Sequence, residues 1–222
     1  MKLKRFAAGF VAAVMTLAVL GTPLGDILPF VRESVATTAG AENYNSFQYK
    51  VLSDGTIEIV KYNGSKDFVS IPESIDNRKV TIIGPTAFRS CETVTKVVIP
   101  ENVICIGNSS FVNCVNLTSV IIPNSVTYIG YEAFNLCKSL ERVTIPSSVT
   151  AIGYEAFSSC KNLKSIDVAS ENNNYVSVNG ILFNKDKTKL ICYPAGKTEM
   201  NYDIPYGVKS IGQHRTINAP LP

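Results

Sequence analysis

The chain has 222 residues, of which 45% are hydrophobic and 18% are charged, a composition typical of one or two globular domains and not of a disordered chain. Its formal net charge is +3, and it falls to +1 when the first 41 residues are set aside. The sequence therefore lacks the basic stripe that nucleic-acid binding requires, and we expect no nucleic-acid partner. A single histidine argues against a histidine-based metal site or a histidine general base. We therefore expect no enzyme, cofactor or bound metal.

The first 41 residues are predicted to be a signal peptide. A basic start precedes an uncharged run over residues 6–20, which is short for a membrane span. Small residues at positions 39 and 41 offer a peptidase site, so we place cleavage after Ala41, or alternatively nearer Ala36. An uncleaved anchor is the competing interpretation, because apolar residues continue to Leu24. Either way we expect a secreted or cell-surface protein, with no membrane span after cleavage.

A 23-residue repeat fills the middle of the chain. Ile-Pro pairs begin at residues 99, 122 and 145, and Ile-Gly pairs begin at residues 83, 106, 129 and 152. Because one such unit cannot bury its apolar face alone, the repeat predicts a solenoid with a continuous core. We expect two of the recurring columns to be structural core. They are Phe88, Phe111, Phe134 and Phe157, and Cys91, Cys114, Cys137 and Cys160.

Each repeat is predicted to hold two extended pieces and one helical turn. A strand rich in β-branched residues ends at the Ile-Pro step, because proline cannot donate to a sheet. A second short strand ends at the Ile-Gly pair, where we expect glycine to allow a backbone angle barred to other residues. Residues 131–137 and 154–160 are interpreted as helical turns with Ala and Phe facing inward. The predicted fold is thus a mainly β solenoid with short helical turns.

The flanking segments complete the predicted domain organisation. Residues 42–70 are expected to form a strand-rich N-terminal cap with a hairpin at Asp54-Gly55. The first repeat carries five extra residues around positions 76–80, which predict a protruding turn. The predicted boundaries are 1–41 for the signal peptide, 42–70 for the cap, 71–168 for four repeats, 169–203 for an inserted loop and β-hairpin, 204–212 for a partial repeat and 213–222 for an irregular tail.

The units resemble the BspA-type leucine-rich repeats of bacterial surface proteins. The resemblance covers residues 71–168 and 204–212, with Val94 replacing the family's leucine and Ser110 replacing its alanine. It implies a secreted or surface-displayed protein that binds other macromolecules, and it implies no catalytic activity. One complete unit carries the pattern as Ile122-Pro123, Val126, Ile129-Gly130, Ala133-Phe134, Cys137, Leu140 and Val143.

The six cysteines admit three interpretations. Four of them recur at the repeat period, which favours buried free thiols stacked in a ladder. Disulfides between coils are the alternative that export would suggest, although parallel side-chain vectors make such bridges awkward. Zinc binding is a third interpretation, and a straight ladder of thiols fits a tetrahedral site poorly. Cys105 and Cys192 lie off this ladder, and Cys105 is expected to face outward as the more reactive thiol.

Two sets of side chains are candidate partner-binding residues. If Val97, Val120 and Val143 point inward, their neighbours along the strands point to solvent. For this set the competing interpretation is an ordinary exposed sheet, and for the second set, three tyrosines, it is the shielding of apolar edges of the coils. The candidates are Lys96, Val98, Ser119, Ile121, Arg142 and Thr144 on the strands, and Tyr128, Tyr131 and Tyr154 as an aromatic patch.

The sequence therefore supports two functions from different classes. The first is an adhesin-like module that binds a protein or glycan on host or neighbouring cells. The second is a structural spacer, or a truncated fragment of a larger surface protein, with no binding of its own. An enzyme that uses Cys105 or Cys192 is a distant third, because no general base accompanies either thiol in the sequence.

Overall fold

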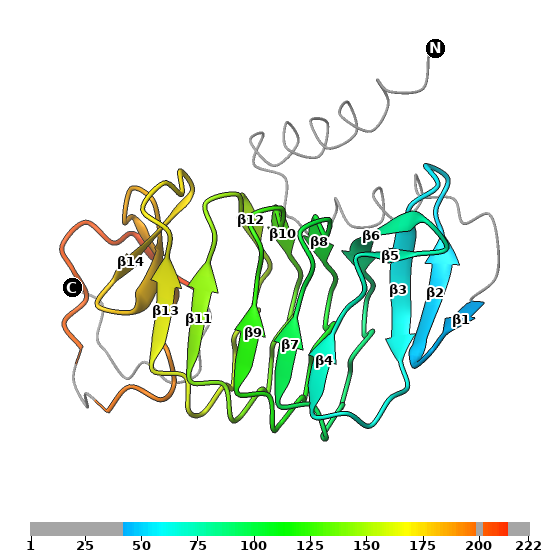
Figure 1. The fold of residues 1–222 in the computed structure, drawn as a ribbon. Coiled ribbons are helices and arrows are strands. Elements are labelled where there is room, and N and C mark those ends of the chain that lie inside the picture. The colour runs from blue at the N-terminus through cyan, green and yellow to red at the C-terminus, as the bar shows by residue number, and fades with distance from the viewer. Residues whose placement is uncertain (1–41, 199–201, 213–222) are drawn as a thin grey trace, which may run out of the picture.

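The structure, a computed structural model, describes residues 42–198 and 202–212. The predicted signal peptide with its cleavage site after Ala41, and the tail that contains His214, lie outside these residues. The described part is an elongated β-solenoid in which successive coils stack along one axis (Figure 1). The solenoid predicted from the repeat is confirmed.

Short parallel strands, one from each coil, form the first wall. They lie side by side along the front of the molecule in Figure 1, and equivalent residues of successive coils pair 23 positions apart. Each of these strands has four residues or fewer, because only one side of each coil belongs to this wall. The strands are β4 (Phe68–Ser70), β7 (Lys96–Val98) and β9 (Ser119–Ile121) in one sheet, and β11 (Arg142–Ile145) paired with β13 (Ser165–Val168).

A second sheet forms the opposite wall and continues into the N-terminal cap. Its inner strands are parallel, whereas β1 to β3 are antiparallel and end the sheet. The order is β1 (Glu42–Tyr44), β2 (Phe47–Val51), β3 (Ile57–Tyr62), β6 (Arg78–Ile83), β8 (Cys105–Ile106), β10 (Tyr128–Ile129) and β12 (Ala151–Ile152).

The five extra residues of the first repeat form a hairpin. β5 (Ser74–Ile75) pairs antiparallel with the start of β6, with Ile75 opposite Arg78. The two residues between them, Asp76 and Asn77, have φ values of 50° and 59°. Asp and Asn tolerate this left-handed conformation, which a two-residue hairpin turn requires at both positions.

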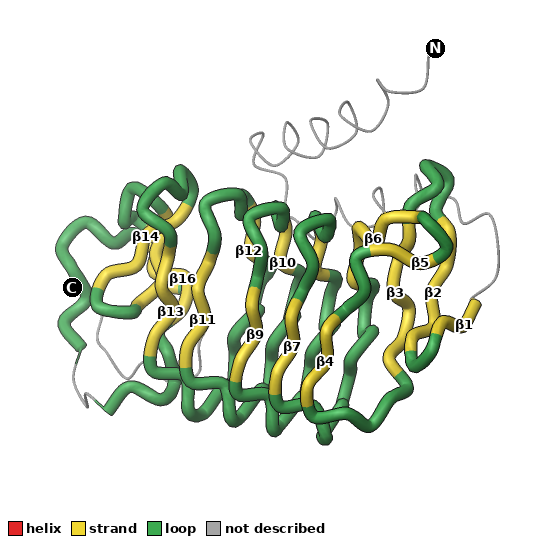
Figure 2. Tube along the Cα trace, viewed as in Figure 1, coloured by secondary structure: helices red, strands yellow, loops and turns green. Residues whose placement is uncertain are grey.

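The third side of each coil is built from consecutive turns, and the helical turns expected there are wrong. The described residues contain no helix, and Figure 2 shows loops throughout this side. In residues 132–137, alternate amides bond to the next coil: the Phe134 amide donates to the Ala156 carbonyl at 2.8 Å. The intervening amides close turns within the coil, and Glu132 and Leu136 have positive φ, which an α-helix excludes. Bonding between coils therefore replaces helical bonding.

A ladder of aromatic rings runs through the core. Phe88, Phe111 and Phe134 are completely buried, and Phe157 is 4% exposed. Their ring centroids are 4.8, 5.1 and 5.6 Å apart in order, with nearly parallel planes. Tyr62 of the cap extends the stack at 5.2 Å from Phe88. The identical spacing of phenylalanines in the sequence thus becomes one continuous apolar column.

The glycines of the Ile-Gly pairs are required for space and not for an unusual backbone angle. Gly130 does not have a positive φ, contrary to the expectation. A Cβ atom on Gly130 would lie 2.6 Å from the backbone nitrogen of Asn108 in the preceding coil, well inside van der Waals contact. The coils approach each other too closely at this corner for any side chain.

A hairpin and one further coil follow the first wall. β14 (Tyr175–Val178), β15 (Ile181–Asn184) and β16 (Lys189–Cys192) form an antiparallel sheet, and β17 (Ser210–Ile211) joins β16 in parallel. The turn between β14 and β15 reaches the open edge of β13, where the Ile166 amide donates to the Gly180 carbonyl at 2.9 Å. The hairpin thus covers one end of the first wall.

Candidate functional site

The outward side chains of β4, β7, β9, β11 and β13 form one continuous surface, which we name the strand face. The middle residue of each strand points into the core: Val97 and Val143 are at most 1% exposed, and Val120 is 8% exposed. Their neighbours point outward, as strand alternation predicts. Of the predicted binding residues, the strand face brings together Lys96, Val98, Ser119, Ile121, Arg142 and Thr144.

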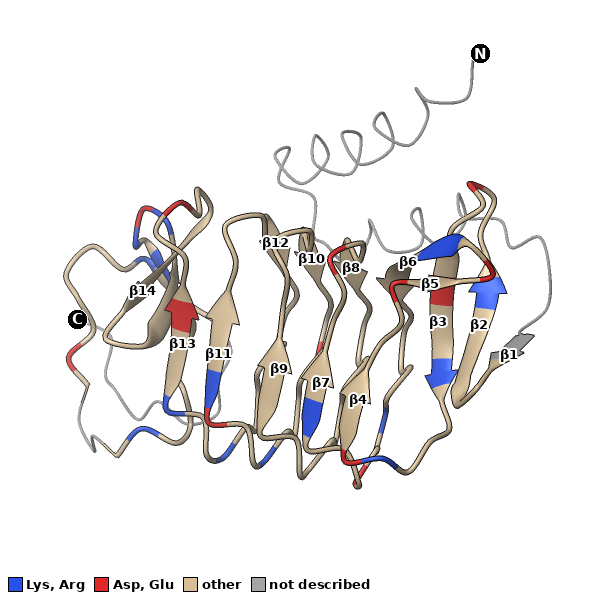
Figure 3. Ribbon diagram, in the orientation of Figure 1, with Lys and Arg blue, Asp and Glu red and all other residues tan. Residues whose placement is uncertain are grey.

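The middle of the strand face is apolar and open. Ile121 is 49% exposed, and the half-buried Val98 lies beside it on the paired strand β7. Thr144 is exposed in the equivalent position of β11. Figure 3 shows that β9 carries no charged residue. An exposed isoleucine on a strand buries little area within its own chain, so this part of the face is suited to contact with another molecule.

The strand face begins one strand earlier than the sequence analysis placed it. β4 lies in the segment predicted to be cap, and it pairs with β7 so that Phe68 stands beside Lys96. Phe68 is 48% exposed, and the Lys96 ammonium lies 5.6 Å from the centre of its ring. The signal for this strand was the pair Ile71-Pro72, which follows β4 just as Ile99-Pro100 follows β7. The extra hairpin, which breaks the 23-residue spacing, had hidden it.

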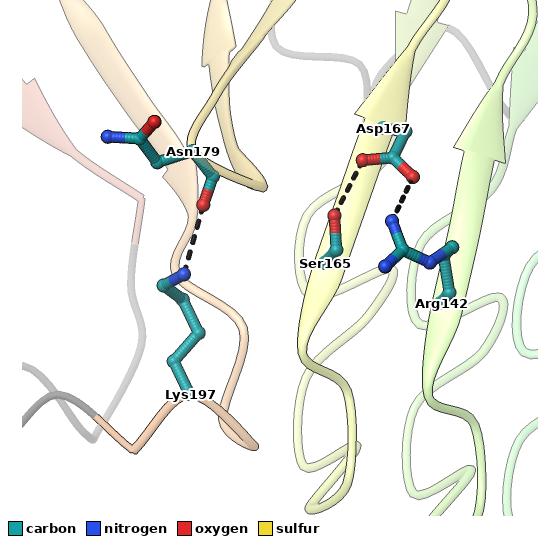
Figure 4. A network of polar contacts seen from close by, with 5 residues as sticks. All are labelled: Arg142, Ser165, Asp167, Asn179 and Lys197. Carbon is teal, nitrogen blue, oxygen red and sulfur yellow. Dashed lines mark hydrogen bonds and ion pairs between the residues drawn. The ribbon is translucent and has the colours of Figure 1, made fainter.

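The other end of the strand face is closed by polar contacts. Arg142 pairs with Asp167 at 2.6 Å, and the Ser165 hydroxyl donates to the same carboxylate at 2.6 Å (Figure 4). Strand alternation alone would direct Ser165 to solvent, but it is only 8% exposed because the turn at Gly180 packs against it. Nearby, Lys197 donates to the carbonyl of Asn179 at 3.0 Å and holds the same turn. The open part of the face therefore ends before β13.

The ion pair also controls the charge at this end. Partial burial alone would raise the pKa of Asp167, but the hydrogen bonds from Ser165 and Arg142 and the charge of Arg142 hold that pKa below its ordinary value. Both charges are thus paired at neutral pH. Besides Arg142, Lys96 is the one cation on the five strands of the strand face, as Figure 3 shows for β7.

The predicted aromatic patch is divided between two places. Tyr131 and Tyr154 stack with ring centroids 6.3 Å apart and are 39% and 44% exposed. They lie just after the second wall, and the hydrogen bond from Tyr131 to Glu132 raises the pKa of that tyrosine to about 12. Tyr128 lies within the second wall, between Cys105 and Ala151, and its hydroxyl is buried. The structure therefore places none of the three on the strand face.

The repeating thiols have a structural partner. Cys114, Cys137 and Cys160 are completely buried, and each donates its S–H to the carbonyl of a phenylalanine in the preceding coil. For Cys137 this contact, to Phe111, measures 3.2 Å. Burial raises the pKa values of Cys114 and Cys160 to about 12 each. All six cysteines are free thiols in the structure, so the ladder satisfies buried carbonyls and forms no bridges.

The expectation that Cys105 is an exposed, reactive thiol is wrong. It is only partly exposed on β8, and burial, with a smaller contribution from Glu58, raises its pKa to about 12. Cys192 is 3% exposed and belongs to the same core as Cys160. Burial raises the pKa of Cys192, and the electrostatic effect of the nearby Cys160 thiol raises that pKa further. A thiol held in its protonated form is a poor nucleophile, and neither residue has the setting of a catalytic cysteine.

Asn172, in the inserted loop, has a structural role that the sequence analysis missed. Its side chain is completely buried and donates to the carbonyls of Pro146 at 2.7 Å and Val149 at 3.0 Å. Its own oxygen accepts the amides of Asn174 and Tyr175, both at 2.8 Å. One side chain thereby attaches the inserted loop to the preceding coil. Three consecutive asparagines in the sequence did not indicate which one would be buried.

Searches for other kinds of site gave the following results. Across residues 42–198 and 202–212, no cluster of three or more metal-ligating side chains occurs. In the same part of the chain, no helix is long and apolar enough to cross a membrane.

Comparison with known proteins places the chain in a family. The BspA type leucine-rich repeat region matches residues 61–189 in six copies, which is more than half of the chain. A leucine-rich repeat protein from Eubacterium ventriosum is similar in structure, with a TM-score of 0.56, 28% identity, and coverage of 78% of this chain and 56% of that protein. One from Bacteroides capillosus has a TM-score of 0.53 and 25% identity, over 60% of this chain and all of that protein.

No curated protein shows significant similarity to the chain. The chain spans only about half of the Eubacterium ventriosum protein, so that protein's activity cannot simply be transferred to it. The repeat region, the stacked coils and the similar solved structures nevertheless agree with one another. The chain belongs to the BspA-type leucine-rich repeat family.

Proposed function

We propose that the chain is an exported, adhesin-like interaction module that binds a protein or glycan on host or neighbouring cells through its strand face. The observation that carries the proposal is the open stretch around Ile121, where a large apolar side chain is 49% exposed on a rigid parallel sheet. Regular strand faces are the surfaces that repeat proteins use for binding. The predicted signal peptide supports export, and membership of the family supports display at the cell surface.

The strand face has the composition of a contact surface. Its centre is formed by Val98, Ile121 and Thr144, its edges by Phe68 with Lys96 and by the paired Arg142 and Asp167. An apolar centre with a polar rim excludes water from the contacts that contribute most to binding. Tyr131 and Tyr154 offer a second, smaller contact surface beyond the opposite wall.

The direct test compares ligand binding by the wild type and three variants. We would measure binding to a panel of purified extracellular matrix proteins and immobilised glycans by biolayer interferometry. Ile121→Glu and Arg142→Glu should weaken any specific ligand about tenfold or more, because each places an unpaired charge in the contact. Asn124→Glu, an exposed position just beyond the strand face, is the matched control and should not change binding. Equal binding by all four proteins would remove the strand face from consideration.

The second candidate is a spacer within a longer surface protein. The similar Eubacterium ventriosum protein extends well beyond the aligned region, which is the observation that favours it. A spacer should show no saturable binding to any member of the panel. It should also tolerate Ile121→Glu without any change in the assembly of the protein at the cell surface.

A further inference from the structure

The first strand of the strand face has an open edge. β4 ends its sheet and pairs with β7 on one side only. The Asp67 carbonyl accepts the Lys96 amide, and the Ile71 amide donates to the Val98 carbonyl, both at 3.1 Å. Odd-numbered residues of this segment therefore bond toward β7. Because alternate residues of a strand direct their backbone groups to opposite sides, those of Phe68 and Ser70 point away from the sheet.

Three backbone groups on this edge are free to bind. The Phe68 amide donates to the Asp67 carboxylate at 2.8 Å. The Phe68 carbonyl and both backbone groups of Ser70 have no hydrogen-bond partner within the described part of the chain. Ile71-Pro72 follows this strand in the sequence. The proline, which lacks an amide hydrogen, therefore lies beyond the residues whose backbone groups are open. An unpaired edge of this kind is a template for another strand.

A hollow lies beside the open edge. It has a volume of about 580 Å³ and lies between β4 and two parts of the cap, residues 44–47 and Tyr62 at the end of β3. Tyr44, Tyr62 and Phe68 are among its lining residues, and Tyr44 and Phe68 are 38% and 48% exposed. Among its lining residues Lys66 is the one that carries a charge, and no carboxylate lines it. Aromatic residues and one cation, with the polar residues Asn45, Ser46 and Ser70 between them, suit an apolar group accompanied by a carboxylate.

We propose that this edge binds an extended peptide segment of a partner protein by β-strand addition. The segment would bond to the Phe68 carbonyl and to the amide and carbonyl of Ser70, and so add one strand beyond β4. Its residue opposite Val69 would point inward, into the aromatic hollow, and is apolar. An acidic residue next to it would pair with Lys66. The site shares Phe68 with the strand face but does not include Ile121 or Arg142, the residues whose variants test the proposed function, so either proposal can fail without the other.

The proposal is tested with random linear heptapeptides displayed on phage and selected against the purified full-length chain. We expect enrichment of peptides in which Asp or Glu neighbours a large apolar residue. Ser70→Pro removes the free amide on the edge and should weaken a selected synthetic peptide about tenfold. Ser70→Ala, the matched control, keeps the amide and should bind as the wild type does. Lys66→Glu should weaken binding, whereas Lys61→Glu, an exposed lysine outside the hollow, should not.

A second measurement does not depend on how the variants fold. The selected peptide is resynthesised with single backbone N-methyl groups, which remove one donor each. Methylation at alternate positions should abolish binding to the wild type and methylation at the others should leave it unchanged, the signature of an added strand. Equal effects at every position would overturn the proposal.

Two other occupants are distinguished by the same reagents. Binding of glycans that is lost in Phe68→Ala but unchanged in Ser70→Pro would assign the hollow to carbohydrate and overturn the proposal. A dimer detected by light scattering for the wild type and absent for Ser70→Pro would assign the edge to a second copy of this chain, and would overturn it as well.

Discussion

The middle coils and the two ends of the solenoid use the same unit in different ways. In the middle, β7 pairs with β4 and β9, β10 pairs with β8 and β12, and each phenylalanine stacks between two others. At the ends, β4 has an open edge and β13 is covered by the turn at Gly180. The middle therefore supplies the shared core, whereas the ends determine where the strand face begins and stops. Stability should depend most on the middle, whereas the extent of the strand face should depend on the ends.

The largest effect is expected from the aromatic ladder. Phe134→Ala removes a ring that stacks at 5.1 Å on one side and 5.6 Å on the other, and should lower the free energy of unfolding by about 4 kcal/mol. Phe157→Ala, at the end of the stack and slightly exposed, should cost about 3 kcal/mol, because its cavity can relax on the open side. Urea denaturation followed by circular dichroism measures both. An equal or larger loss for Phe157→Ala would contradict the distinction between middle and end.

The next effect sharpens the role of close contact between coils. Gly130→Ala places a Cβ atom 2.6 Å from the backbone of the preceding coil and should cost about 3 kcal/mol of unfolding free energy through overpacking. Gly207, near the end, has nothing within 4 Å of the same position and a φ of 100°. Gly207→Ala should therefore cost only about 1 kcal/mol, from backbone strain alone. Thermal unfolding of both variants tests the contrast, and a small effect at Gly130 would show that the coils can separate.

Buried thiols predict a loss of stability at high pH. The pKa values of Cys105, Cys114 and Cys160 are raised from 9.0 to about 12 in the folded chain. Above pH 9 the unfolded chain loses these protons while the folded chain keeps them, so stability falls as pH rises. Each thiol should contribute a loss of about 1.4 kcal/mol near pH 10.

Urea titrations at pH 8 and pH 10 measure this effect. The Cys114→Val variant should lose less stability between the two values than the wild type does. A variant at the half-buried Cys91, whose pKa is raised less by its surroundings, provides the control at the end of the ladder. Identical slopes for the wild type and Cys114→Val would show that this thiol does not report on folding.

The repeat predicted the middle of the molecule well and its ends poorly, for physical reasons. Stacking of Phe88 to Phe157, and inward-pointing Val97, Val120 and Val143, follow from spacing alone, because each coil repeats the environment of the last. The turns of the third side were mistaken for helix because Ala-Phe at this spacing fits both. Only bonding to a neighbouring coil, which a single unit does not display, decides between them.

The candidate site was predicted in part. Strand alternation placed Lys96, Ile121 and Arg142 on one surface. It did not show that Ser165 would be covered, because the covering turn lies about 15 residues later and reaches β13 through tertiary contacts. The expectation that Cys105 is exposed failed for a related reason. The exposure of a residue in a wall depends on its neighbours in the adjacent coils, and for Cys105 these are Ile82 and Tyr128.

The smallest effect concerns the closed end of the strand face. Arg142→Ala breaks the pair with Asp167, whose side chains are 65% and 41% exposed, so solvent screening should limit the loss of unfolding free energy to about 0.5 kcal/mol. Lys164→Ala breaks the pair with Glu141, in which both side chains are more than 60% exposed. Among the described residues, Glu141 has no second hydrogen bond like the one that Ser165 gives to Asp167. The loss of unfolding free energy in Lys164→Ala should therefore be smaller still.

The two variants also differ in their response to acid. The pKa of Asp167 is lowered in the folded chain, so the stability from its pair is present above the unfolded value of 3.8 and is lost as pH falls below it. Urea titrations at pH 7 and at successively lower pH below 3.8 should therefore show the difference between the wild type and Arg142→Ala shrinking as the pH falls through the lowered pKa of Asp167, with Lys164→Ala close to the wild type throughout. A difference for Arg142→Ala that persists at the lowest pH would mean that this arginine supports the closed end through packing and not through its charge. The hydrogen bonds from the Ile166 amide and the Lys197 ammonium would still hold the turn at Gly180, so the loss would lie in the contact between Arg142 and β13.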